Sequence, residues 1–236
     1  MSQTSWEAAL AELWDAESLT AAQQAAASLI DLAVPGGAAV DVNATHLLSA
    51  YRDRGAAITA HPHRAYLLAV LLSIGTWGGS WRRAASGNPS LAPTAAAEEQ
   101  LQAQLSTICN EYRSLLDDGD PQTRALIALL LGTSATAPDA TLELLDRYRA
   151  EDEPLVQGCL MQGLIRAIAR LGPQDLANRA GEVSALLSDA GDEVVARANL
   201  EIHGPWRTPT ESAALAQRFT VPPYAAEPTL WPAENV

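Results

Sequence analysis

The sequence Asp120-Pro121-Gln122-Thr123-Arg124 opens an apolar segment and returns twice further along the chain. Its second copy is Glu153-Pro154-Leu155-Val156-Gln157, and a looser third copy, DEVVAR, lies at 192–197. The copies lie 33 and 39 residues apart, counted from 120 to 153 and from 153 to 192. Repeats of this period are typical of stacked helical hairpins, because one hairpin cannot bury its apolar face alone.

The first copy has the chemistry of a helix start. Asp120 is a good N-cap, and Pro121 suits the first helical position, where its missing N–H costs no hydrogen bond. Apolar residues at helical spacing follow it and recur along most of the chain. We therefore predict an all-α fold, with helices near 3–17, 19–34, 43–54, 62–75, 94–116, 121–132, 139–148 and 154–171.

Two of these helices carry further signals. The helix at 94–116 has one apolar stripe, which we expect to be core, and the helix at 154–171 is apolar around most of its circumference. A helix of the second kind must lie between neighbours. Gly158 and Gly163 inside it predict the close approach of another helix, since each costs about 1 kcal/mol relative to Ala. The stripe consists of Leu101, Leu105, Ile108, Tyr112 and Leu115.

Composition supports helices and sets the charge of the protein. Of the 236 residues, 48% are hydrophobic, mostly Ala and Leu, which favour helices over strands. All 15 basic residues are Arg, and 28 acidic residues bring the net charge to −13. Such a field repels phosphate backbones and anionic membranes and speeds encounter with a basic protein. We predict no nucleic-acid or membrane partner, and a protein partner of basic character.

The N-terminus and the cysteines predict a cytoplasmic location. Residues 1–7, MSQTSWE, lack the basic and apolar regions of a secretory signal. The longest apolar run, at 65–74, is about half the length that spans a bilayer. Two cysteines, Cys109 and Cys159, are too few for a disulfide framework, and each lies in an apolar helical stretch. We expect both to be buried free thiols.

Changes in composition divide the chain into four segments. They are N-terminal helical hairpins at 1–75, an irregular segment at 76–93, the repeats at 94–203 and a Pro-rich C-terminal extension at 204–236. The phrase His61-Pro62-His63-Arg64 is similar to a shortened copy of the first repeat start. It would extend the repeats toward the N-terminus, so we expect one continuous domain.

The irregular segment holds the predicted binding residues Trp77, Trp81, Arg82 and Arg83. Trp and Arg on a long loop are the residue types enriched at binding hot spots. A second interpretation stays open, in which the two tryptophans fill a gap between the halves of the protein and the two arginines reach water.

The sequence predicts no catalytic residue, metal or cofactor. His61 and His63, with Cys109 or Asp53, come nearest to a metal set, but no Cys-x-x-Cys or His-Glu-x-x-His spacing occurs. We interpret the two histidines as solvated side chains at a helix start. The Gly-x-Ser-x-Gly frame of serine hydrolases is absent. Acidic clusters fall at helix junctions, where helix N-termini attract carboxylates.

The repeat starts at 120–124, 153–157 and 192–197 give the chain a resemblance to HEAT-like helical repeat proteins. The similarity is to the bacterial kind related to phycobilisome lyases, common in actinobacteria. In that family an Asp-Pro turn is followed by Val and Arg, and the Arg bonds to an adjacent repeat. Only Arg124 occupies that position here, where Gln157 and Ala196 depart from the pattern. The resemblance implies a right-handed superhelical solenoid of antiparallel helix pairs.

Solenoids present long surfaces to partners. We therefore expect a non-catalytic scaffold or adaptor, such as an immunity or antitoxin-like protein that neutralises a basic partner. The alternative is an enzyme or small-molecule binder, with a pocket between helical pairs under a lid formed by 76–93.

Overall fold

The computed structural model describes residues 5–34, 42–77, 92–168, 170–171 and 185–186. Every regular element in these ranges is helical, so the predicted all-α class is confirmed there. The chain divides into two compact units, Met1–Arg113 and Ser114–Val236. The third repeat start and the Pro-rich extension at 204–236 lie outside the described residues.

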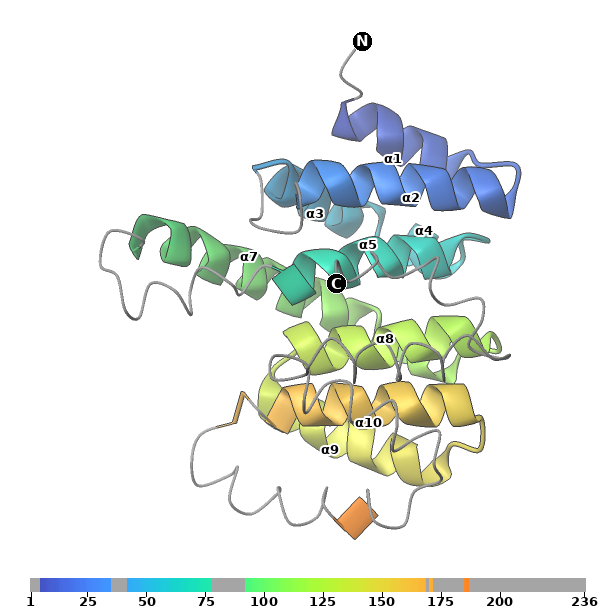
Figure 1. Ribbon diagram of the computed structural model, residues 1–236, viewed down its shortest axis with the longest axis vertical. Coiled ribbons are helices and arrows are strands. Elements are labelled where there is room, and N and C mark those ends of the chain that lie inside the picture. Colours follow the sequence, from blue (N-terminus) through green and yellow to red (C-terminus); the bar gives the residue numbers. More distant parts are fainter. Residues whose placement is uncertain (1–4, 35–41, 78–91, 169, 172–184, 187–236) are drawn as a thin grey trace, which may run out of the picture. The chain divides into compact units, whose positions relative to one another are not determined.

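The first unit contains six described α-helices (Figure 1). α1 packs on α2, α2 also contacts α5, and α7 lies against α3. Serines provide the caps of the first hairpin, because Ser5 and Ser18 accept hydrogen bonds of 3.2 Å from the N–H groups of Ala8 and Ala21. The helices are α1 (Trp6–Trp14), α2 (Leu19–Ala33), α3 (Val42–Arg54), α4 (Ala56–Thr59), α5 (Arg64–Trp77) and α7 (Ala92–Glu111).

The predicted starts of α3 and α5 differ from the structure by one and two residues. α3 begins at Val42, so Asn43 lies inside it and its Nδ2 donates to the carbonyl of Leu32 at 3.4 Å. α5 begins at Arg64, because His61 and Pro62 form a turn after the short helix α4, which we did not predict. Gly55 permits the break between α3 and α4, since its φ of 34° is disfavoured for residues with a Cβ.

Two buried tyrosines connect three helices of the first unit. The hydroxyl of Tyr51 on α3 donates to the carbonyl of Leu67 on α5 at 3.0 Å. The hydroxyl of Tyr112, after α7, donates to the carbonyl of Tyr51 at 3.2 Å. Burial raises the pKa of both phenols, so both remain hydrogen-bond donors. The predicted stripe is buried throughout, but α7 ends at Glu111, so Tyr112 follows the helix and Leu115 lies in the short 3₁₀ helix at Arg113–Asp117.

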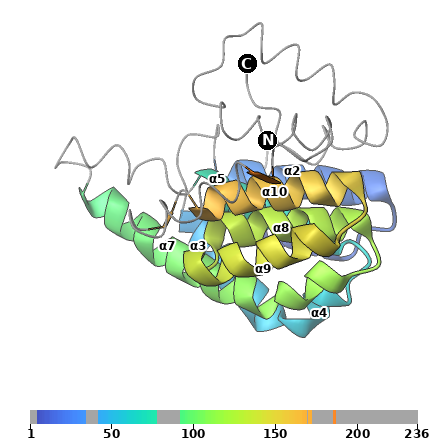
Figure 2. The same cartoon turned by 90° about the horizontal axis from the view of Figure 1, so that it is seen from below.

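The second unit begins with the short 3₁₀ helix η3 (Arg113–Asp117), which spans the unit boundary. It continues with α8 (Pro121–Ser134), α9 (Ala137–Ala150) and α10 (Pro154–Ile168). α9 begins at Ala137, two residues before the predicted start at 139, so Asp139 does not cap the helix but lies in its first turn. α8 and α10 lie side by side in both views (Figures 1 and 2), and each also contacts α9.

Glycine allows α8 and α10 to touch through their backbones. A Cβ at Gly132 would meet the backbone of Gly163, including its carbonyl carbon at 2.5 Å. A Cβ at Gly163 would meet the carbonyl group of Ala128, whose carbon would lie 3.1 Å away. The close approach predicted from Gly163 is therefore confirmed. We expected Gly132 to mark the end of its helix, but α8 continues to Ser134.

Two arginines, Arg166 of α10 and Arg170 after it, bind the C-terminal end of α8 beside the glycine contact. Arg166 donates to Oγ1 of Thr133 at 2.9 Å, and Arg170 donates to the carbonyl of Gly132 at 2.8 Å. Cations suit this place because the last carbonyls of a helix lack partners within it. Gln162, a polar residue of this largely apolar helix, is also buried. Cys109 and Cys159 are buried and form no disulfide with each other, as predicted.

Candidate functional site

The residues predicted to bind a partner fall mostly outside the described ranges. Trp77 is the last residue of α5, whereas Trp81, Arg82 and Arg83 lie between α5 and α7, where the structure describes no residue. Helix covers both ends of the segment that we expected to be irregular, because α5 continues through Trp77 and α7 starts at Ala92. The binding role of the four residues stays a prediction.

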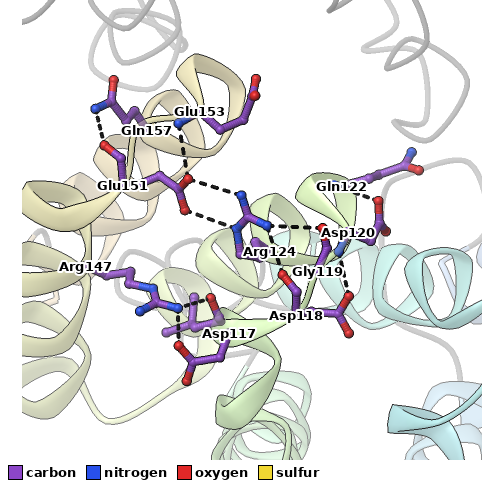
Figure 3. A network of polar contacts seen from close by, with 11 residues as sticks. Asp117, Asp118, Gly119, Asp120, Gln122, Arg124, Arg147, Glu151, Glu153 and Gln157 are labelled. Atoms are coloured by element: carbon purple, nitrogen blue, oxygen red, sulfur yellow. Dashed lines mark hydrogen bonds and ion pairs between the residues drawn. The ribbon is translucent and has the colours of Figure 1, made fainter.

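The first repeat start forms a compact set of hydrogen bonds at the beginning of α8 (Figure 3). Asp120 accepts from the N–H groups of Gln122 at 3.3 Å and Thr123 at 3.0 Å, so the predicted cap is confirmed. The N–H of Asp120 donates to Oδ1 of Asp118 at 2.8 Å. Arg124 then donates to the carbonyl of Asp118 at 2.9 Å, which closes the turn.

The second repeat start makes two of these contacts again 33 residues later. The N–H of Glu153 donates to Oε1 of Glu151 at 3.2 Å, as Asp120 does to Asp118. Gln157 donates to the carbonyl of Glu151 at 2.5 Å and so takes the place of Arg124. The amide of Gln157 thus performs one of the roles of the expected arginine.

One ion pair joins the two repeat starts. Arg124 donates to both carboxylate oxygens of Glu151, each at 3.1 Å, and the two side chains are only 16% and 7% exposed. Arg147 of α9 pairs with Asp117 and also donates to the carbonyl of Leu116. As Figure 3 shows, the carboxylates of this junction hold helix ends and neighbouring turns together. This agrees with our structural interpretation of the acidic clusters.

A hollow of about 210 Å³ lies between α3 and α7 of the first unit. α3 contributes Leu48, Ser49 and Arg52, and α7 contributes Gln104, Thr107 and Ile108. The two hydroxyls are occupied within their own helices, Ser49 with the carbonyl of Thr45 and Thr107 with that of Ala103, each at 3.1 Å. The polar groups left to meet a ligand are therefore the guanidinium of Arg52 and the amide of Gln104.

The histidine pair is a structural contact rather than two solvated side chains, so that interpretation was wrong for His61, which is 8% exposed. Its Nε2 lies 3.1 Å from the carbonyl of Trp14, and its Nδ1 accepts the N–H of His63 at 3.1 Å. Nε2 of His63 lies 2.8 Å from the carbonyl of Ala16. The two imidazoles thus hold the end of α1 against the turn before α5.

The surroundings of His61 favour its neutral form. Burial is the largest cause and lowers its pKa, and the nearby His63 lowers it further. The hydrogen bond to Trp14 and the charge of Asp15 raise the pKa, but the net shift is downward. Nδ1 of His61 already accepts a hydrogen bond, so a proton there would face the N–H of His63. Within the described residues, no group of three or more His, Cys, Asp or Glu side chains is placed to hold a metal ion.

Sequence reasoning did not single out Arg52 or Gln104. Each is one polar residue in an amphipathic helix, and no motif or spacing distinguishes it from other solvent-facing residues. Comparison of the chain with protein-family models, curated proteins and solved structures found no match. In the described part of the chain, no helix combines the length and apolar character needed to cross a membrane.

Proposed function

We propose that this protein is a non-catalytic scaffold or adaptor built from HEAT-like helical repeats, and that it binds a basic protein partner. The observation that carries the proposal is the set of matching hydrogen bonds at Asp118–Arg124 and Glu151–Gln157, 33 residues apart. Helices that repeat in this way form extended surfaces, which repeat proteins commonly use to bind other proteins.

Charge supports a basic partner. The net charge is −13, and the repeat junction of the second unit includes exposed carboxylates. The side chain of Asp117 is 76% exposed and that of Asp146 is 81% exposed, while Asp152 is also exposed. Complementary charge raises the rate of encounter and selects among partners. Neutralisation of a basic effector, as by an immunity or antitoxin-like protein, belongs to this proposal.

Affinity purification from the source cell's lysate tests it, with the full chain as bait. We expect a stoichiometric basic protein whose retention falls as salt is raised, because surface charges are screened. An Asp146→Asn/Asp152→Asn bait should retain less, whereas the matched Arg149→Gln bait, which makes the protein more acidic, should retain at least as much. The Arg82→Glu/Arg83→Glu bait tests the predicted loop. The proposal would be contradicted if the captured proteins are acidic. It would also be contradicted if the amount of captured protein changes neither with salt nor between the charge variants.

A further inference from the structure

We propose that the hollow between α3 and α7 is a binding site for a small carboxylic acid that carries an N–H donor beside its carboxylate. This inference goes beyond the scaffold role and does not depend on it. It rests on the guanidinium of Arg52 and the side-chain oxygen of Gln104, which have no partner among the described residues and come from two helices to the same hollow.

Arg52 differs from the other arginines in the described part of the chain. It is exposed, and no described residue supplies it with a hydrogen-bond acceptor, an ion pair or an aromatic ring. A guanidinium offers a fork of N–H donors that matches a carboxylate. Each of the other described arginines has at least one such contact: Arg54, Arg64, Arg113, Arg124, Arg147, Arg149, Arg166 and Arg170.

Gln104 lines the same hollow, and the oxygen of its side-chain amide is unsatisfied. Its Oε1 is covered and has no hydrogen-bond partner among the described residues. A covered acceptor without a donor is costly, so the protein gains if the amide turns into the hollow and its Oε1 pairs there with an N–H of a ligand. The terminal torsion of a glutamine side chain is soft, and the amide can therefore turn toward a ligand without moving α7.

The size and floor of the hollow define the rest of the ligand. Leu48 and Ile108, each 1% exposed, give it an apolar base. Its volume of about 210 Å³ lies below the roughly 300–1,000 Å³ of sites that hold drug-sized ligands. The chemistry is that of a short N-acylated amino acid, whose carboxylate pairs with Arg52 and whose N–H pairs with Gln104.

Titration of the ¹⁵N-labelled full chain with N-acetylglycine, followed by amide NMR shifts, tests the site. We expect saturable shifts concentrated in α3 and α7. N-acetylglycinamide, which lacks the carboxylate, should give no saturable shift. Arg52→Gln should weaken binding roughly tenfold or more, since a charge-assisted bidentate pair is lost. Arg52→Lys, which keeps the charge without the fork, should fall between wild type and Arg52→Gln.

Two further variants separate the site from general charge effects. Gln104→Leu should weaken binding severalfold, and the matched charge control Arg149→Gln, on α9, should bind as wild type does. Because Arg52 is exposed, its variants should keep the wild-type amide spectrum. The proposal is overturned if N-acetylglycine gives no saturable shift in α3 and α7, if N-acetylglycinamide binds equally well, or if Arg52→Gln leaves the affinity unchanged.

Discussion

The two units keep their helices together with contacts of different kinds. In the second unit, one set of bonds occurs at both repeat starts, and a glycine of α8 meets a glycine of α10. In the first unit, the helices are joined by single contacts from Tyr51, Tyr112, His61 and His63 to backbone carbonyls. The second unit therefore contains hydrogen bonds that recur at two helix starts, whereas these contacts of the first unit each occur once in its described residues.

The largest expected effect comes from closing the glycine contact. In Gly132→Ala, the added Cβ meets the backbone of Gly163, which cannot move aside as a flexible side chain would. We expect a loss of about 3 kcal/mol in the free energy of unfolding, at the upper end for overpacked cores. Urea unfolding measures it, and hydrogen exchange should place the loss in the second unit.

Gly119→Ala is the matched control, because a Cβ there meets no described atom within 4 Å. We expect it to be neutral or slightly stabilising. If Gly132→Ala costs no more than Gly119→Ala, the two helices do not depend on this contact.

The next effect comes from the ion pair between the repeat starts. Glu151→Gln removes the carboxylate charge that accepts hydrogen bonds from Nε and Nη2 of Arg124 at a mostly buried position. We expect a loss of about 2 kcal/mol in the free energy of unfolding. Asp146→Asn breaks the exposed pair with Arg149 and should cost less than about 0.5 kcal/mol. Equal costs, measured by urea unfolding, would mean that burial adds nothing to the Arg124 pair.

In the first unit, Tyr51→Phe tests a contact that occurs once. It leaves the carbonyl of Leu67 without the phenol donor, and we expect a loss of about 1 kcal/mol in the free energy of unfolding. Tyr66→Phe is the control, since the Tyr66 hydroxyl makes no hydrogen bond to a described residue, and it should change stability by less than about 0.5 kcal/mol. Thermal unfolding of both variants separates the hydrogen bond from a general effect of losing a hydroxyl.

The smallest effect should appear as a dependence on pH. The pKa of His61 is lower in the folded protein than in the unfolded chain, so the unfolded chain binds the proton more readily. Stability should therefore fall as pH drops below about 6.5, the ordinary pKa of histidine. His61→Gln should flatten this dependence, measured by thermal unfolding from pH 7 downward, while His46→Gln, at an exposed residue, should keep it. A slope unaltered by His61→Gln would assign the pH dependence to other groups.

The same difference between the units explains which features were predictable. Asp120 and Pro121 predicted the start of α8, and Gly163 predicted the close approach of another helix. These features were predictable because each depends on the residue types at one place in the sequence. The residue that Gly163 meets was not predictable, since Gly132 looked like a helix end. Spacing indicates that elements repeat, and it does not indicate which atoms touch.

Contacts between distant residues left no local signal. Tyr51 and Leu67 are 16 residues apart, and His61 and Trp14 are 47 residues apart. No motif in the sequence around one residue of each pair indicates that it contacts the other. Arg52 and Gln104 belong to the same class, because only the packing of α3 against α7 brings them to one hollow. The sequence instead directed attention to Trp81, Arg82 and Arg83, whose role stays a prediction.

The backbone contact between α8 and α10 also has a mechanical consequence. Gly132 is the only glycine of α8, so a shift of α10 along it would bring a side chain against the backbone of Gly163. A steric clash therefore opposes sliding of α10 along α8 by part of a helical turn in either direction. Under a pulling force or on binding a partner, we therefore expect α8 and α10 to move together as one rigid unit.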